Sequence, residues 1–179
     1  WHPAIELAIA KRCEPCCTPF LTLLSRRWWD YQHDQLSRPS EKNANTKQDY
    51  VMKALQVREN GAPLDVLNIV DIPPPQVGEG QVLIKVSAGS LNFNDIDRCY
   101  GRRISVPTPP PFTLGMDVCG IVEQTGEDAR QWLGKRVVAV TANATGGLAE
   151  YAIASRDMVF DAPENMSDAE AAAFIIPFH

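Results

Sequence analysis

The sequence predicts a mainly β fold with a few short helices, arranged as a β-barrel or a sandwich-like domain. Short runs of β-branched and alternating apolar residues recur at close spacing from residue 52 to residue 160. Glycine and proline punctuate these runs and indicate turns between strands. The 179 residues are 45% hydrophobic, which is typical of a globular protein and allows one ordinary domain with an appendage.

Residues 1–50 differ in character from the rest of the chain and are expected to be a poorly ordered extension. The stretch 37–48 is almost entirely polar, which is typical of a linker. Cys13 and Cys16 have the spacing of one half of a zinc site, with His33 as a further candidate ligand. A second pair at a usable spacing is absent from the sequence, so ordinary thiols are favoured over a metal site.

From residue 51 onward, the pattern predicts strands separated by tight turns. The predicted strands cover residues 51–57, 66–72, 81–87, 115–123, 136–140, 146–153 and 158–160. A run of three prolines at 73–75 must leave the sheet, because proline cannot donate to a ladder. A short helix is predicted over 94–99, ending at Gly101. A second helix begins with a capping box between Ser167 and Glu170 and is expected to continue until Pro177.

Charge and cysteine content exclude several classes of partner. The net charge is −5 and no long block of basic residues occurs, so neither nucleic acid nor an anionic membrane is an expected partner. No apolar run reaches the roughly 18 residues that cross a bilayer. Five cysteines, three of them within five residues, do not resemble a secreted disulfide framework. A reduced, cytoplasmic protein is therefore expected.

Six motifs occur in one order along residues 52–179. They are MKALQV, GEGQVLIKVSAGSLNFND, LGMDVCGIVE, GKRVV, GGLAEYA and PENMSDAEAAAF. In this order they resemble the N-terminal, GroES-like catalytic domain of the medium-chain dehydrogenase/reductase superfamily, specifically its zinc-independent quinone oxidoreductase branch. The resemblance implies a partly open β-barrel over residues 51–179. It also implies that residues 1–50 lie outside the family pattern. The chain begins with Trp1 and ends at His179 within an apolar helical pattern, so both ends are expected to be truncations.

The resemblance implies a reaction without zinc. Asn92 and the Met116-Asp117 pair stand where zinc-dependent relatives carry a Cys and a His-Glu pair, and an amide and a thioether are poor zinc ligands. The implied chemistry is hydride transfer from NADPH or NADH to a quinone or an activated alkene such as an enone or enal. An enoyl-thioester reductase of lipid or polyketide type is the enzymatic alternative. A GroES-like binding module without catalysis is the non-enzymatic one.

The implied site lies between residues 87 and 123. Asn92 is the first candidate for both catalysis and cofactor binding, as an amide that donates to a developing oxyanion; its alternative is capping the helix that follows. Asp95 is a second catalytic candidate, with stabilisation of the first helical turn as its alternative. Tyr100 and Met116 are the further cofactor-binding candidates. Asp97 stands where many relatives carry a Tyr, which puts one cofactor contact in doubt.

Two other groups of side chains have plainer interpretations. Cys119 is expected to be a buried core thiol, because Cys behaves as a small hydrophobe in an apolar strand. Arg98, Arg102 and Arg103 are expected to form a solvated surface cluster, with an anion site as the alternative.

The sequence contains no Gly-rich strand-turn-helix fingerprint, so the Rossmann domain of the family is expected to be absent from this chain. The chain alone is then expected to be inactive, and the longer parent protein to be a homodimer.

Overall fold

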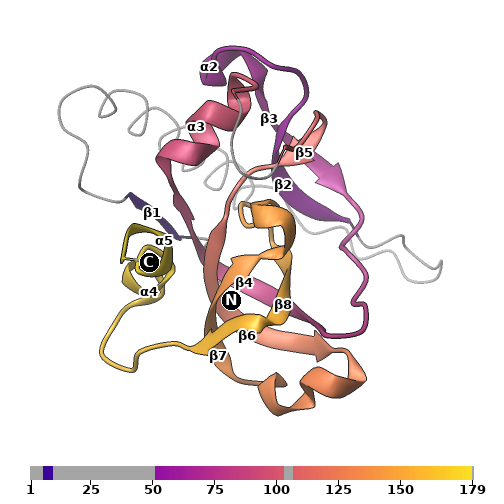
Figure 1. Ribbon diagram of the computed structural model, residues 1–179, viewed down its shortest axis with the longest axis vertical. Coiled ribbons are helices and arrows are strands. Elements are labelled where there is room, and N and C mark those ends of the chain that lie inside the picture. Colours follow the sequence, from indigo (N-terminus) through magenta and orange to yellow (C-terminus); the bar gives the residue numbers. More distant parts are fainter. Residues whose placement is uncertain (1–5, 10–50, 103–106, 179) are drawn as a thin grey trace, which may run out of the picture.

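A computed structural model describes residues 6–9, 51–102 and 107–178, and its centre is a β-barrel (Figure 1). Strand β4 pairs with both β6 and β8, and β7 lies between those two, so the sheet closes on itself. The barrel strands are β4 (Gln81–Leu91), β6 (Asp117–Thr125), β7 (Arg136–Thr141) and β8 (Tyr151–Asp161). The mainly β fold with short helices is thereby confirmed.

A second, three-stranded sheet lies beside the barrel in the order β3-β2-β5. Its strands are β2 (Met52–Val57), β3 (Leu67–Ile72) and β5 (Phe112–Thr113). The Leu55 N–H donates to the Leu148 carbonyl at 2.8 Å, and an isolated bridge pairs Ala54 with Ala149. Backbone hydrogen bonds therefore join this sheet to the segment that leads into β8.

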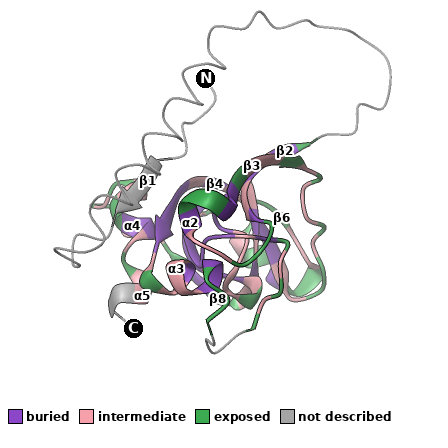
Figure 2. Cartoon of the chain, turned by 90° about the horizontal axis from the view of Figure 1, so that it is seen from above, coloured by how far each residue is buried: buried purple, intermediate pink, exposed green. Residues whose placement is uncertain are grey.

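Alternation along the strands produces the barrel core. Side chains on one face of each strand point inward with period two, and these positions carry mostly Val, Ile and Ala. Figure 2 shows buried residues concentrated in β4 and the strands around it. The fully buried core side chains include Val82, Ile84, Val118, Val122 and Val137. Burying a side chain of this size stabilises the fold by about 1.5–3 kcal/mol relative to leaving it exposed.

Two predicted strand boundaries were wrong. The strand expected to begin at Val66 begins at Leu67, because α2 (Pro63–Val66) precedes it with proline in its first turn. The two strands expected at 146–153 and 158–160 form the single strand β8, whose first half pairs with β4 and whose second half pairs with β7. One long strand thus serves two partners.

Strand β1 (Glu6–Ile9) was not predicted. It pairs in parallel with Ala88–Leu91, the last part of β4, which extends beyond the predicted end at Ser87. The rest of residues 1–50, with Cys13, Cys16 and His33, lies outside the described residues. The interpretation of that segment as a poorly ordered extension, and of its cysteines as ordinary thiols, stays a prediction.

The C-terminal helix begins as predicted and ends early. Ser167 and Glu170 form the predicted capping box at the start of α4 (Asp168–Ala172). The chain then turns and begins a separate helix, α5 (Ile175–Phe178). Pro177 cannot continue α4, because its ring would clash with the carbonyl of Ala173 one turn earlier, but it is tolerated in the first turn of a new helix. The remaining helices are α3 (Phe93–Cys99), η1 (Glu127–Trp132) and η2 (Ala142–Ala144).

Candidate functional site

The candidate site begins where β4 ends and α3 starts. Asn92 has an extended backbone and is the N-cap of α3, which spans the predicted helix. The Asn92 N–H donates to Asp95 Oδ2 at 2.9 Å, and the two residues form a capping box. The capping hydrogen bond comes from the Asp95 side chain, while the Asn92 amide nitrogen contacts Ser90 and Asp117, so the capping alternative for the Asn92 side chain stays a prediction. Its side chain is only partly buried, so a ligand can still reach it.

Asp95 lies on the buried side of the first turn of α3, with 1% of its surface exposed. Its Oδ1 accepts the Gly115 N–H at 3.2 Å, so one carboxylate joins the start of α3 to the loop before β6. Burial raises the pKa of Asp95 to about 6, against the lowering effect of the two backbone hydrogen bonds, while Asp117 nearby raises it further. Both oxygens are occupied by backbone donors, which supports the structural alternative for Asp95.

Asp117, at the start of β6, is fully buried and accepts hydrogen bonds from three directions. Ser90 Oγ and Asn92 Nδ2 both donate to its Oδ1, the latter at 2.9 Å. The Ile176 N–H donates to its Oδ2 at 3.4 Å. Burial raises the pKa of Asp117, and the hydrogen bonds from Ser90, Asn92 and Ile176 oppose that effect.

The Asn92 amide nitrogen has a second acceptor. Its Nδ2 lies 3.1 Å from Ser90 Oγ, whose own hydrogen is donated to Asp117. The two acceptors are hydrogen-bonded to each other, so both lie on the same side of the amide nitrogen. We call Ser90, Asn92 and Asp117 the amide network.

Met116 directly precedes Asp117, one of the three residues of the amide network, and is buried. Its backbone carbonyl accepts the Thr141 N–H at 2.7 Å and the Thr141 hydroxyl at 3.0 Å, which fixes the start of β6 against β7. Within the ranges that the structure describes, no group of three or more His, Cys, Asp or Glu side chains could hold a metal ion.

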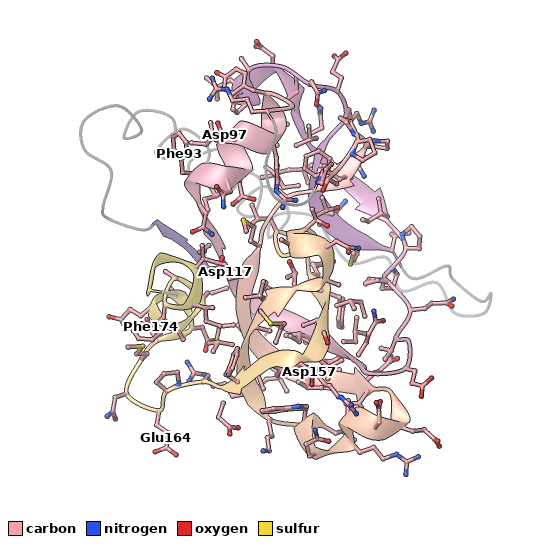
Figure 3. The ribbon with its side chains drawn as sticks, viewed as in Figure 1. Phe93, Asp97, Asp117, Asp157, Glu164 and Phe174 are labelled. Atoms are coloured by element: carbon pink, nitrogen blue, oxygen red, sulfur yellow. The ribbon has the colours of Figure 1, made fainter. Side chains whose placement is uncertain are left out.

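Tyr100 lies at the other end of α3 and is 43% exposed. The Arg102 guanidinium lies 4.6 Å from the centre of its ring, and Arg102 Nη1 also pairs with Asp97 Oδ1 at 2.7 Å. Figure 3 shows Asp97 on α3 well apart from Asp117. The structure therefore does not bring Tyr100 against Asn92, and its cofactor contact stays a prediction.

Arg98 is not part of a solvated cluster, so that interpretation was wrong for this residue. Only 4% of its surface is exposed, because it lies on the face of α3 that packs inward. Its Nη1 donates to Thr108 Oγ1 at 3.2 Å, while its Nε has no partner among the residues described. Burial lowers the pKa of Arg98, which nearby Asp95 opposes. Arg103 lies outside the described residues.

Ser90 and Asp117 are site residues for which the sequence predicted no role. The available signal was a charged residue at the start of the otherwise apolar run from Val118 to Val122. A buried charge must be paired or hydrogen-bonded, so this Asp predicts polar partners nearby. Cys119, two residues on, is fully buried as predicted, and burial raises the pKa of its thiol to about 12.

Comparison with known proteins agrees with this architecture. Residues 78–164 match the alcohol dehydrogenase GroES-like domain. The chain is 36% identical over 129 residues to a chloroplastic quinone-oxidoreductase of Triphysaria versicolor, covering 70% of this chain and 39% of that protein. It is 38% identical over 131 residues to the quinone oxidoreductase of Sus scrofa, covering 72% and 39%. The quinone oxidoreductase of Thermus thermophilus, solved with NADPH, superposes with a TM-score of 0.59 at 36% identity, covering 71% and 38%.

The chain spans about two-fifths of the length of these relatives. No helix in the described part of the chain is long and apolar enough to cross a membrane. The motif order, the closed barrel and these similarities agree, and the chain belongs to the medium-chain dehydrogenase/reductase superfamily, as a GroES-like domain of its quinone oxidoreductase branch.

Proposed function

We propose that this chain supplies the catalytic domain of an NAD(P)H-dependent oxidoreductase that transfers hydride to a quinone or to an activated alkene such as an enone or enal. Its relatives are named quinone oxidoreductases, and the Thermus thermophilus relative was solved with NADPH. The chain covers less than half of those proteins, so the activity belongs to a longer protein that contains it.

The observation that carries the proposal is the amide network. Asn92 is partly exposed between the end of β4 and the start of α3, yet its amide is held from within by Ser90 and Asp117. A fixed polar group at an accessible position orients a ligand at little entropic cost. The amide carbonyl, with two lone pairs, suits a donor such as the carboxamide of nicotinamide.

Bound nicotinamide would supply the hydride. The residues of this chain would hold the nicotinamide ring in position. Asn92 would hold the ring against the barrel, and Met116 would provide a buried, metal-free wall behind it. The groups around Asn92 are an amide, a hydroxyl, a thioether and the single carboxylate of Asp117, and one carboxylate is fewer than the three protein ligands of a catalytic zinc site, which favours a site without zinc. Asp95 is proposed to hold the site in place by accepting the backbone N–H groups of Asn92 and Gly115. Tyr100 is proposed to contact only a part of the cofactor that extends past α3.

The test is a chimera in which residues 52–179 replace the matching part of the Sus scrofa quinone oxidoreductase. NADPH oxidation is followed at saturating quinone and, separately, with enones and enoyl thioesters. We expect turnover with quinone or enone, and a loss on the order of 10²-fold in the Asn92→Ser variant. Serine is as good an N-cap as asparagine, so this variant keeps the capping role while removing the amide.

The outcomes separate the competing functions. Preference for enoyl thioesters would favour the lipid or polyketide type of reductase. A folded chimera that neither oxidises NADPH nor gains thermal stability from it would favour a non-enzymatic binding module. Equal activity of Asn92→Ser and the parent chimera would leave Asn92 with its capping role alone.

We propose a cytoplasmic location and a homodimer for the longer protein. The two cysteines in the described part of the chain, Cys99 at the end of α3 and Cys119 in β6, are free thiols, as expected in a reducing compartment. Two relatives, from Triphysaria versicolor and Spinacia oleracea, are named as chloroplastic. Fluorescence imaging of a tagged full-length protein would decide between these compartments, and light scattering would test the proposed homodimer.

A further inference from the structure

We infer that the outer edge of the last part of β4 is a docking site for an extended peptide strand, and that β1 fills this site in this chain. By filling it, β1 holds residues 88–91 in place, and with them Ser90 of the amide network. The inference goes beyond the proposed function, and its test needs no cofactor.

Strand β8 leaves this edge of β4 without a partner. It pairs with Gln81–Lys85, and the Glu150 carbonyl that precedes it accepts the Val86 N–H at 2.9 Å. Beyond Val86, β6 continues along one edge of β4 as far as Gly89, but β8 does not follow along the other edge. Of the strands that the structure describes, β1 takes this place, and the sheet order there is β1-β4-β6.

The burial of residues 88–91 explains why this edge requires a strand. All four residues are buried, and Ala88 and Ser90 have no exposed surface. Buried backbone N–H and C=O groups need hydrogen-bond partners. A strand supplies such partners along a whole edge, which is how extended peptides bind to the sheets of other proteins. The ligand that fits this edge is therefore an extended peptide.

The pairing of β1 covers this edge over its full length. The two strands run parallel, from Glu6 opposite Ala88 to Ile9 opposite Leu91. Strand β1 also lies close to α4, which packs on β4 and β6 (Figure 1). A parallel partner requires a long connection, and residues 10–51 lie between β1 and β2. The strand lies outside residues 78–164, which match the GroES-like domain, so this partner comes from beyond the matched region.

Strand β1 reaches the candidate site through Ser90. Ala8 lies opposite Ser90 in the register, and the Ser90 hydroxyl donates to Asp117. Asn92 follows two residues later, at the start of α3. Without β1, the segment that carries Ser90 would lose one of its two neighbouring strands, while the first half of β4 would keep both β6 and β8. Residues 6–9 thus have a defined role within a segment that the sequence predicts to be an extension.

The experiment uses the 179-residue chain and measures the exchange of backbone amides in β4 by NMR. Leu7→Pro and Ala8→Pro are each other's matched control, because only one of two consecutive residues in an edge strand directs its N–H to the neighbouring strand. Proline removes that N–H. We expect one variant to accelerate exchange about tenfold or more at those amides of residues 88–91 that face β1, and the other to have a much smaller effect. Exchange at Val82 and Ile84 should not change.

A synthetic peptide with the sequence of residues 4–11 tests the edge as a docking site. Added to the proline variant that has lost protection, it should restore slow exchange at residues 88–91 as its concentration rises. A peptide that carries the same proline is the control and should restore nothing.

Three results would overturn the inference. Unchanged exchange at residues 88–91 in both variants would mean that β1 does not hold this edge. Equal acceleration at residues 88–91 and at Val82 and Ile84 would indicate general loosening. A peptide without effect would mean that the edge does not accept a free strand. None of these results depends on NADPH, so failure of the proposed function would appear in the chimera and failure of this inference in the exchange rates.

Discussion

The two ends of α3 carry similar side chains in opposite surroundings. At the N-terminal end Asp95 is fully buried, and both of its oxygens accept backbone N–H groups. At the C-terminal end Asp97, whose side chain is 19% exposed, pairs with Arg102, whose side chain is 58% exposed. Two residues along one helix thus separate a buried carboxylate held by backbone N–H groups from a partly exposed one whose partner is an exposed guanidinium.

The difference lies in what happens after a side chain is removed. At the buried end each missing acceptor leaves a donor without a partner, which costs about 1–3 kcal/mol for each orphaned group. At the exposed end solvent takes the place of the lost partner, and surface ion pairs contribute about 0–1 kcal/mol. The predictions below set matched residues at the two ends against each other.

The largest effect is expected for Gly115→Ala against Gly101→Ala. Gly115 has φ of 98°, and an added Cβ would lie 2.5 Å from the Leu148 backbone nitrogen. Gly101 has φ of 66°, and its added Cβ would meet the Asn60 side chain, which can move. We expect Gly115→Ala to lower the free energy of unfolding by more than about 4 kcal/mol and Gly101→Ala by about 1–2 kcal/mol, measured by urea denaturation.

A double variant sharpens this first comparison. Asn60→Ala removes the obstacle at Gly101, so Gly101→Ala in that background should retain only the cost of the positive φ, about 1 kcal/mol. No such relief exists at Gly115, where the obstacle is backbone. Equal destabilisation at the two glycines would contradict the contrast between the ends.

Asp95→Ala against Asp97→Ala comes next. Removing the Asp95 carboxylate leaves the Asn92 and Gly115 N–H groups without their acceptor, and we expect a loss of about 2–4 kcal/mol in the free energy of unfolding. For Asp97→Ala we expect less than about 1 kcal/mol. Denaturation of both variants in one buffer at pH 7 checks the ordering, and a larger loss for Asp97→Ala would reverse the argument.

The same carboxylate predicts a pH dependence. The pKa of Asp95 is about 6 in the folded chain against an ordinary 3.8, so the folded state binds the extra proton. Stability from this group is therefore fully present below about pH 4 and is lost as the pH rises through 6, by about 3 kcal/mol in total. Burial raises the pKa of Asp117 as well, which acts in the same direction.

Asp95→Asn isolates the contribution of Asp95. The difference in unfolding free energy, parent minus variant, should fall by about 3 kcal/mol between pH 4 and pH 7. The same measurement on Asp157→Asn is the control for replacing a carboxylate that is not buried, since that side chain is 81% exposed. If the difference for Asp95→Asn rises with pH instead, the two backbone hydrogen bonds lower the pKa of Asp95 by more than burial raises it.

Much of the fold could be predicted because the strands carry their pattern locally. Period-two alternation located the barrel strands, and the Ser167–Glu170 capping box located the start of α4. The single strand β8 could not be predicted, because its two halves are defined by two different partners. The pairing of β1 with β4 is likewise a long-range choice that four residues do not encode.

The site was predictable in place and less so in arrangement. Asn92 and Asp95 follow from the turn at the end of β4, and both lie at the start of α3. Ser90 and Asp117 are 27 positions apart, so only the pairing of β4 with β6 brings them together. The burial of Arg98 could not be predicted, because Arg98 and Arg102 lie only four residues apart and the sequence does not show which of the two faces the interior.

The smallest effect is expected within the exposed cluster itself. Asp97, Tyr100 and Arg102 form a chain in which Arg102 contacts both partners, at 2.7 Å to the carboxylate and 4.6 Å to the ring centre. A double-mutant cycle of Asp97→Asn and Arg102→Gln should give a coupling energy below about 0.5 kcal/mol, decreasing with added salt, because the guanidinium is largely hydrated. A coupling above about 1.5 kcal/mol that persists in about 1 M salt would mean that this end of α3 is as tightly determined as the buried end. Exposure would then no longer explain the difference between Asp95 and Asp97, which would have to come from the kind of partner that each carboxylate has.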